Sequence, residues 1–288
     1  MPEFTVPEEL EGISVQHFLR RYCHVSARLL AKLKRTEKGM TVGEQKIRSI
    51  DTLHAGDVVC LRFPQDTSDI IPVFMQPDIV YEDETLLIVN KPPFMPVHPV
   101  REHQTDTLAN GIMFYSRQKG ENYTFRAVNR LDKDTSGLIA VAKNAYAHTF
   151  LIRHIEKKYR ALCEGELYGS GTIRTPIRLK EGSVMQREAA EGGMSAVTHY
   201  TSVAVENGHT LLSLWLETGR THQIRVHLSS IGHPLAGDEL YGGSRRIFQR
   251  QCLHCESLCL THPVSGEKMM FSRKAEDWMK LLRDFSSS

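Results

Sequence analysis

The hydrophobic positions of the first part of the chain predict two short helices followed by strands. Apolar residues recur at helical spacing within Ile13–Tyr22, and again in a second segment from Ala27 to about Lys38. Short strands are expected around Met40–Val42 and at Asp57–Phe63. We therefore expect residues 1–63 to form a small α/β module of their own.

The pattern changes after this module. Residues 64–77 are mostly polar between Pro64 and Pro72 and show little periodicity, which predicts a linker. Residues 78–288 mix strands and helices without the regular alternation of a doubly wound sheet, so we expect an α+β domain whose mixed, largely antiparallel sheet is flanked by helices and loops. Helices are expected at Leu108–Ser116 and Ala145–Ile155, and strands at Ile79–Tyr81, Leu86–Asn90, Leu138–Ala142, Lys158–Glu164, Ala196–Ala204, Thr210–Thr218 and Gln251–Leu260.

The composition is that of a globular protein. Hydrophobic residues make up 41% of the 288 residues and charged residues 24%, which argues against a disordered chain. No apolar run approaches the roughly 20 residues that a membrane helix needs, and the acidic N-terminus does not resemble a signal peptide. We therefore expect a cytoplasmic protein without membrane contact, whose six cysteines are reduced thiols.

The charge is nearly balanced, so binding to nucleic acid would have to rest on local basic patches. The formal net charge is only +2. One patch is predicted on the helix that begins at Ala27, where Arg28, Lys32 and Arg35 share a face. Such a face is either a phosphate-binding surface or an ordinary solvated one, and the helix alone does not distinguish the two.

A dense polar cluster precedes the strand predicted at Leu138–Ala142. The run NRLDKDTSGL carries Arg130, Asp132 and Asp134 directly before apolar residues. Polar groups at the end of a buried strand are held rigidly, which suits a functional site. Taken alone, the run is more readily explained by a turn whose Asp and Thr side chains bond local backbone groups.

A second polar cluster lies in the run LETGRTHQIRVHL. It contains Arg220, His222 and Arg225 before Val226 and Leu228 return to the core. The alternative is an edge strand with a solvated face. An arginine from this cluster near the first one would favour an ionised carboxylate and orient it. A nucleophilic or basic Asp needs that ionised form at neutral pH.

Four motifs follow one another in the second part of the chain. They are NRLDKDTSGL, KKYRALCEG, TGRTHQIRVH and GHPLAGDELYG. Together they resemble the motifs of the RluA-type pseudouridine synthases, which isomerise uridine in RNA, and the resemblance extends from about Ile79 to the C-terminus. It implies that Asp132 is the catalytic carboxylate and that Arg225 pairs with it. It also implies that Arg130 helps to displace the target base and that Tyr159 stacks on the uracil.

Two details accompany this resemblance. Asn129 stands where many relatives have His, and because it lies outside the residues just named we expect it to affect the choice of RNA rather than the chemistry. Arg220 and His222 are further candidates for contacts with RNA.

The first module resembles the S4-like RNA-binding domain, which often accompanies such synthases. The resemblance rests on two helices followed by TVGEQKIRS and LHAGDVVCLRF. It implies that the face of Arg28, Lys32 and Arg35 lies against RNA phosphates. Gly43 stands in a turn where many relatives have Asn, and both residues tolerate positive φ.

The family's reaction defines the expected partners. It breaks the bond between ribose C1′ and uracil N1 and rejoins the ring through C5, with Asp132 either attacking C1′ or removing a ribose proton. No electron or phosphoryl group is transferred, so no cofactor and no metal are expected. The substrate is expected to be ribosomal RNA, with transfer RNA as the alternative, and the enzyme is expected to act as a monomer.

Two other functions remain open on sequence grounds. Asp132 and Asp134 form the D-x-D element that begins haloacid-dehalogenase phosphatases, although there the element ends a strand and recruits magnesium. The chain could also be an RNA-binding protein whose catalytic domain is degenerate.

A metal site is a further alternative. Cys252, Cys255, Cys259 and His262 have the spacing of a short zinc knuckle. A strand is favoured for this segment, because alternation would place Cys255 and Cys259 on one face and Cys252 and His254 on the other.

Overall fold

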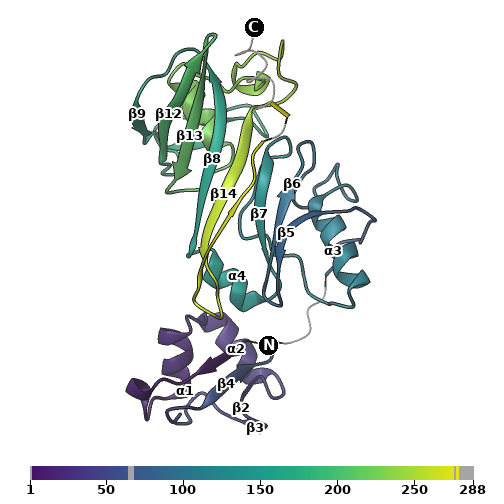
Figure 1. Cartoon of the computed structure of the whole chain (residues 1–288), viewed down its shortest axis with the longest axis vertical. Helices are drawn as coiled ribbons and strands as arrows, with labels where there is room; N and C mark the ends of the chain where they lie inside the picture. Colours follow the sequence, from purple (N-terminus) through teal and green to yellow (C-terminus); the bar gives the residue numbers. More distant parts are fainter. Residues whose placement is uncertain (1, 64–67, 276, 279–288) are drawn as a thin grey trace.

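Two β-sheets divide the chain into two units. This computed structural model describes residues 2–63, 68–275 and 277–278. A four-stranded sheet belongs to residues 2–63, here the N-terminal module, and a nine-stranded sheet runs through the larger unit that follows (Figure 1). Residues 64–67 of the expected linker lie outside the described residues.

The N-terminal module builds one small apolar core from short helical segments and antiparallel strands. Its sheet has the order β1, β4, β2, β3. The strands are β1 (Glu3–Thr5), β2 (Met40–Val42), β3 (Gln45–Lys46) and β4 (Val58–Leu61), and the helical segments are η1 (Glu8–Leu10), α1 (Val15–His17), its continuation η2 (Phe18–Tyr22) and α2 (Ala27–Arg35). Gly43 adopts a φ of 54° in the turn between β2 and β3, as its position predicts.

Helix α2 begins at the predicted residue and ends earlier. The Ser26 hydroxyl caps it by accepting the backbone N–H of Leu29 at 3.1 Å. The helix stops at Arg35 rather than near Lys38, because Thr36 turns to an extended ψ of 135° and its hydroxyl donates to the carbonyl four residues earlier.

The sheet of the larger unit is mixed and largely antiparallel, which confirms the predicted fold class. Its strands follow the order β5, β6, β7, β14, β8, β13, β12, β9, and β15 pairs with β14. Within the described residues, β7 and β14 form its one parallel pair. The strands are β5 (Asp78–Glu82), β6 (Leu86–Lys91), β7 (Ser136–Ala142), β8 (Ile155–Glu164), β9 (Ser170–Ile173), β12 (Thr198–Glu206), β13 (His209–Leu216), β14 (Leu253–Thr261) and β15 (Lys268–Ser272), and a separate hairpin pairs β10 (Ile177–Leu179) with β11 (Arg187–Ala189).

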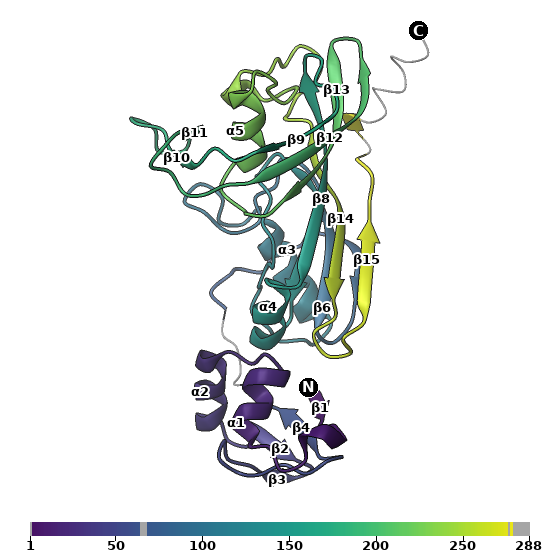
Figure 2. The same cartoon turned by 90° about the vertical axis from the view of Figure 1, so that its left-hand side faces the viewer.

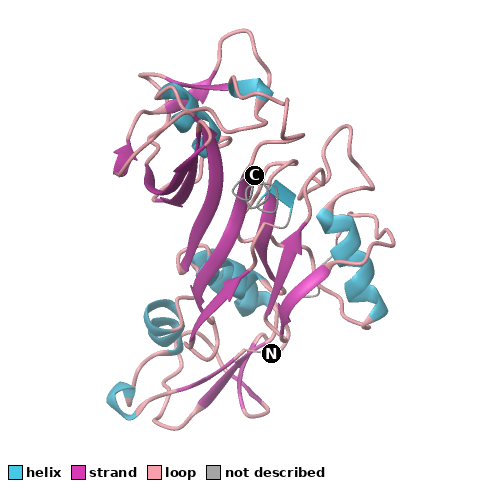
Figure 3. Ribbon diagram, turned by 45° about the horizontal axis from the view of Figure 1, so that its top comes forward, coloured by secondary structure: helices cyan, strands magenta, loops and turns pink. Residues whose placement is uncertain are grey.

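Short helices flank these long strands, as Figure 3 shows in cyan and magenta. They are α3 (Leu108–Gln118), α4 (Ala145–Leu151), α5 (Gln223–Ser230) and the single turn η3 (Glu239–Tyr241). The helix predicted to reach Ile155 ends at Leu151, and Ile155 instead opens β8. In the part of the chain that the structure describes, every helix is too short or too polar to cross a membrane.

The segment after Arg220 contains a helix, and the alternative of a solvated edge strand is wrong. Helix α5 buries each residue from Gln223 to Leu228. Its apolar residues Ile224, Val226 and Leu228 alternate like those of a strand. A helix buried on all sides shows no polar face, so the usual helical signal is missing from the sequence.

The cysteine segment forms a strand, β14, as expected, but its two faces differ from the prediction. The pairing of β14 with β8 shifts between Cys255 and Ser257, which is a β-bulge. The bulge inverts the alternation beyond it, so Cys255 is buried while Cys259 is exposed. Among the described side chains, no group of three His, Cys, Asp or Glu is arranged to hold a metal ion.

The two units are joined by side-chain contacts as well as by the chain. Tyr146 of α4 lies in the apolar core of the N-terminal module and meets Phe4 edge-on at 5.4 Å. Phe150 of α4 lies 6.1 Å from the ring of His24 in the module. Helix α4 is therefore the platform on which the module sits (Figure 1).

Part of the expected linker packs along helix α3. The side-chain amide of Asn110 donates to the Ile71 carbonyl at 2.7 Å, and the Asn110 carbonyl accepts the Val73 N–H at 3.2 Å. Phe74 meets Phe114 edge-on at 5.4 Å. These contacts hold residues 71–74 against the larger unit.

Candidate active site

Asp132 lies in the loop that leads into β7. The buried side chains of Lys91 and Arg250 bind the backbone of this loop. The ammonium of Lys91 donates to the carbonyl of Lys133 at 3.0 Å. The guanidinium of Arg250 donates to the carbonyl of Asp134 at 2.9 Å. Burial, together with the charge of Arg250, lowers the pKa of Lys91 to about 7. The loop is therefore tied to the protein at the two residues that directly follow Asp132.

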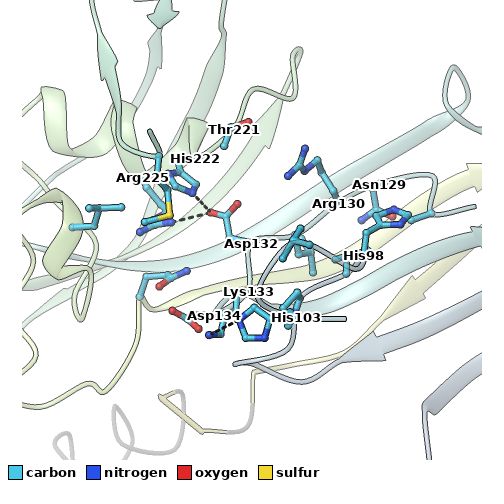
Figure 4. A pocket seen from close by; sticks show the side chains of 18 of the residues that line it. His98, His103, Asn129, Arg130, Asp132, Lys133, Asp134, Thr221, His222 and Arg225 are labelled. Carbon is cyan, nitrogen blue, oxygen red and sulfur yellow. Dashed lines mark hydrogen bonds and ion pairs between the residues drawn. The ribbon is translucent and has the colours of Figure 1, made fainter. Parts of the chain in front are cut away.

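Helix α5 brings Arg225 to this carboxylate. The Nη1 of Arg225 donates to Oδ2 of Asp132 at 3.1 Å, and Figure 4 shows the two side chains pointing toward each other. Both are sheltered, with side-chain exposures of 8% and 21%. The pair that the sequence leaves as an inference is therefore present in the fold, across a separation of 93 residues.

Asp238, whose side chain is only 1% exposed, binds the other two nitrogens of the same guanidinium. Oδ2 of Asp238 accepts from Nε of Arg225 at 2.6 Å, and Oδ1 accepts from Nη2 at 2.8 Å. Burial alone would lower the pKa of Arg225, but the hydrogen bonds and charge of Asp238, with those of Asp132, raise it. The arginine is thus a permanent cation between two carboxylates.

His222 approaches the same carboxylate oxygen of Asp132 as Arg225 does (Figure 4). Its Nε2 is 3.9 Å from Oδ2 of Asp132, and its Nδ1 is 2.8 Å from the hydroxyl of Tyr241. Burial lowers the pKa of His222, while the Asp132 charge opposes that effect. The ring of Tyr241 also covers Arg225, whose Cζ lies 4.9 Å from the ring centroid.

Tyr159 comes from the centre of the sheet, on β8. It is 6% exposed, and burial raises the pKa of its hydroxyl well above the usual value. Its ring helps to form a small pocket of about 60 Å³. This pocket brings together all the residues expected at the reacting base and two of those expected to contact RNA, namely Arg130, Asp132, Tyr159, Arg220, His222 and Arg225.

A larger cavity of about 970 Å³ adjoins this pocket and shares Asp132, His222 and Arg225 with it. It extends from α5 to the loops 96–103 and 127–134. In Figure 4 Arg130 lies beside this cavity, and the Lys133 ammonium is 3.2 Å from Nε2 of His103. The opening is much larger than one base and carries several basic side chains.

The remaining expected site residues have different surroundings. Arg220 donates from Nε to the Ser195 carbonyl at 2.9 Å, so part of its guanidinium is used within the protein. Asn129 binds the edge of β7 with its amide, which donates to the carbonyl of Leu138 at 3.0 Å and accepts the N–H of Ala140 at 2.9 Å. Its amide therefore completes the backbone pairing of β7 at the rim of the cavity.

The three basic residues expected to meet RNA phosphates lie on the N-terminal module. Arg28, Lys32 and Arg35 are exposed on α2. Figure 2 shows α2 on the same side of the molecule as the β10–β11 hairpin. They form a surface separate from the pocket.

Four residues that matter to the geometry were not identified from the sequence: Lys91, Asp238, Tyr241 and Arg250. Asp238 and Tyr241 belong to GHPLAGDELYG, which the sequence analysis singled out without assigning a role to any of its residues. The motif itself was recognisable, but nothing in the run GHPLAGDELYG indicates that the Asp238 carboxylate faces α5.

Comparisons with known proteins match this chain to RNA pseudouridine synthases. The sequence profile described as RNA pseudouridylate synthase matches residues 85–230. The RNA pseudouridine synthase YjbO of Bacillus subtilis is 37% identical over 268 residues, which cover 90% of this chain and 95% of that protein. The ribosomal large subunit pseudouridine synthase D of Pseudomonas aeruginosa is 36% identical over 297 residues, covering 96% and 91%.

A solved structure supports the fold independently. The human RNA pseudouridylate synthase domain containing 1 superimposes with a TM-score of 0.56 at 24% identity, over 74% of this chain and 96% of that one. Since motifs, sheet and near full-length relatives agree, the chain belongs to the RluA-type family of RNA pseudouridylate synthases, enzymes that isomerise uridine in RNA.

Proposed function

We propose that Asp132 is the catalytic carboxylate of this pseudouridine synthase and that the target uracil lies against Tyr159. The observation that carries the proposal is the contact between Asp132 and Arg225 inside a pocket that Tyr159 also lines. A nucleophile and a base both require the carboxylate to be ionised. The buried guanidinium of Arg225 donates a hydrogen bond to this carboxylate and places a positive charge beside it.

In the proposed reaction, the bond between C1′ and N1 breaks and its electron pair leaves with the uracil. Asp132 either attacks C1′ or removes a ribose proton to permit this step. The ring then turns, C5 bonds to C1′, C5 loses its proton and N1 gains one. The face of Tyr159 would retain the detached ring, since stacking of a base on an aromatic side chain contributes about 1–3 kcal/mol.

The target nucleotide must leave its stack before it reaches Asp132, which costs a few kcal/mol in typical cases. Arg130 is exposed and lines both the pocket and the cavity beside it. We assign it the task of occupying the space that the base leaves. Arg220 and His222 line the pocket as well and are proposed to contact the RNA.

Ribosomal RNA is the proposed substrate, with transfer RNA as the alternative. Relatives with 34–39% identity are called ribosomal large subunit pseudouridine synthase D, and they cover most of this chain. The N-terminal module is proposed to act as an S4-like RNA-binding domain through Arg28, Lys32 and Arg35, because these side chains are exposed on one helix.

The reaction moves no electrons and no phosphoryl group, so we propose that it proceeds without cofactor or metal, in a cytoplasmic monomer. A phosphatase function finds no support, because the family is established and Asp132 precedes β7 instead of ending a strand. An RNA-binding protein with a degenerate catalytic site is disfavoured as well, since Asp132, Tyr159 and Arg225 share one pocket.

The test is a pseudouridine map of RNA from a strain that lacks this protein, complemented with variants. Wild type should restore the missing sites. Asp132→Asn should restore none of them while still binding RNA. Asp78→Asn is the matched control, because it makes the same change at an exposed residue of β5 that lines neither the pocket nor the cavity, and it should restore every site. Normal modification by Asp132→Asn would overturn the assignment of the catalytic carboxylate.

A further inference from the structure

His222 occupies a backbone conformation that a residue with a side chain seldom adopts. Its φ is 57°, in the left-handed region, at the residue that precedes α5. Such a conformation costs free energy and persists only where the surroundings fix it. Here it turns the imidazole toward Asp132, with Nε2 3.9 Å from the carboxylate and the side chain 11% exposed. The protein therefore holds this ring at a defined place in the pocket.

The neighbours of Tyr241 define which nitrogen of His222 carries the proton. The Tyr241 hydroxyl accepts the backbone N–H of Arg187 at 3.0 Å. Its own proton then needs an acceptor, and Nδ1 of His222 is 2.8 Å away. Burial raises the pKa of Tyr241, so the hydroxyl stays protonated and able to donate. Burial also lowers the pKa of His222, which favours a neutral ring.

We propose that Tyr241 fixes His222 in the tautomer with hydrogen on Nε2, and that this N–H is a hydrogen-bond donor to the uracil during the reaction. A neutral imidazole that accepts at Nδ1 carries its hydrogen at Nε2. That nitrogen faces the pocket beside Asp132. The inference rests on the proposed role of Asp132 and extends it by naming the group that receives the leaving base.

The chemistry of the leaving base gives this donor its function. When C1′–N1 breaks, the electron pair goes to the uracil, and the negative charge spreads onto the ring carbonyl oxygens. The carbonyl oxygen on the carbon next to N1 must lie close to C1′, and so close to Asp132. A donor fixed beside the carboxylate can stabilise that oxygen as its charge develops. Because the charge develops only as the bond breaks, after the substrate has bound, the donor should act on kcat rather than on KM.

The decisive variants differ only in where they place an amide donor. In His222→Gln the side-chain NH₂ can reach the position of Nε2, whereas in His222→Asn it lies nearer that of Nδ1. Asn also tolerates the left-handed backbone, so His222→Asn should fold normally. We expect His222→Asn to lose about 100-fold in kcat, the cost of one such donor, with KM little changed. His222→Gln should retain more than a tenth of wild-type kcat.

Tyr241→Phe tests the tautomer separately, because it removes the hydroxyl and keeps the ring that covers Arg225. We expect a loss in kcat of roughly 3- to 10-fold, the range of one neutral hydrogen bond. The imidazole nitrogen NMR signals of His222, assigned by their absence in His222→Asn, should shift toward a mixture of tautomers. Tyr81→Phe is the matched control: its hydroxyl also donates a hydrogen bond, to Oδ2 of Asp83 at 2.8 Å, and Tyr81 does not line the pocket or the cavity.

The assay should use RNA labelled with tritium at uracil C5, prepared from a strain lacking the protein, since tritium is released when C5 bonds to C1′. Wild-type kcat in His222→Asn, or an unchanged His222 spectrum in Tyr241→Phe, would overturn this inference. If Asp132→Asn is inactive while His222→Asn is fully active, only the role of His222 fails. If Asp132→Asn releases tritium normally, the proposed function itself fails.

Discussion

At the scale of single residues, the site depends on one arginine held between two carboxylates. Asp238 accepts hydrogen bonds from Nε and Nη2 of Arg225, and the remaining Nη1 donates to Asp132. A guanidinium is a planar fork with fixed donor directions, so a grip on two nitrogens also sets the direction of the third. Asp238 therefore acts as a positioning residue, which orients the partner of the proposed catalytic carboxylate.

Asp238→Asn should lower kcat by about 10- to 100-fold, because it loosens a group that must be held within about 1 Å. RNA affinity should change little. The melting temperature should fall by several degrees, because the buried charge of Arg225 loses part of its compensation. Kinetics with the tritium-release assay and thermal denaturation measure both effects.

Glu82→Gln is the matched control for this loss of stability. It also breaks a sheltered ion pair, with Lys143 at 2.7 Å, but Glu82 is not among the residues that line the cavity. It should lower the melting temperature and leave kcat unchanged. A wild-type kcat in Asp238→Asn would show that Arg225 does not need its second carboxylate.

At the scale of elements, the parallel pairing of β7 with β14 sets the position of the loop that carries Asp132. Gly137 of β7 has a φ of 117°, and a Cβ placed there would lie 2.4 Å from the carbonyl oxygen of Cys255 on β14. The two backbones approach so closely that no side chain fits between them. His254 strengthens the same junction, since its Nδ1 is 2.8 Å from the Ser136 hydroxyl.

Gly137→Ala is expected to push β7 away from β14 and displace the loop that carries Asp132. Both the melting temperature and kcat should fall, and the activity loss should exceed 10-fold because the loop is tied to this strand. Gly120→Ala is the control, because Gly120 also has a positive φ, 73°, but its Cβ would meet nothing within 4 Å. Equal effects in the two variants would mean that backbone strain, not the close crossing, is responsible.

A partly buried cluster of charges connects β5 with the end of α3 and with the residue that follows β7. The Glu82 carboxylate contacts Lys143 at 2.7 Å, Lys119 at 2.8 Å and the Tyr115 hydroxyl at 2.7 Å. Burial alone would raise the pKa of Glu82, but these hydrogen bonds lower it from 4.5 to about 2. The folded state thus binds the proton less readily than the unfolded state.

Stability from a lowered carboxyl pKa is complete above the unfolded value and is lost as pH falls through the folded value. The difference in melting temperature between wild type and Glu82→Gln should therefore be largest above pH 4.5 and shrink toward pH 2. Calorimetry across this range measures it. A difference that does not depend on pH would contradict the assigned ion pair.

At the scale of the whole molecule, the two units are proposed to bind one RNA together. Helix α2 and the β10–β11 hairpin lie on one side, while β15 lies on the opposite side (Figure 2). Helix α4 fixes the module to the larger unit through Tyr146, whose hydroxyl also donates to the Pro263 carbonyl. A rigid attachment would let phosphate contacts on α2 orient the RNA over the cavity.

Charge reversal at Arg28, Lys32 and Arg35 together should weaken RNA binding and flatten its salt dependence, because each lost phosphate contact reduces counterion release. Filter binding over a series of salt concentrations measures both. Reversal of Lys268, Arg273 and Lys274, which are exposed at or beside β15, is the control and should leave affinity unchanged. Equal affinity in the two triple variants would remove α2 from the binding surface.

Helix α2 has a clear polar face and was predictable from the sequence, and so was the fully buried strand β7, whereas the fully buried helix α5 was not. Helix α2 and most strands of the large sheet lie close to their predicted positions, because helical spacing, alternation or a short apolar run leaves a local record. Helix α5 has no such record, since Gln223 to Leu228 are all buried. The bulge in β14 likewise inverted the predicted faces beyond Cys255, because one extra residue changes every later position.

The local spacing of residues was therefore sufficient to predict the fold class and the family. It also named Asp132, Tyr159 and Arg225 as candidate site residues. Only the folded chain decided how they meet. Arg225 reaches Asp132 from 93 residues away. Asp238, directly before η3, binds Arg225, and Tyr241 of η3 binds His222. The reason is physical. Periodicity reports whether a residue faces core or solvent, whereas a contact between distant residues depends on the path of the whole backbone between them.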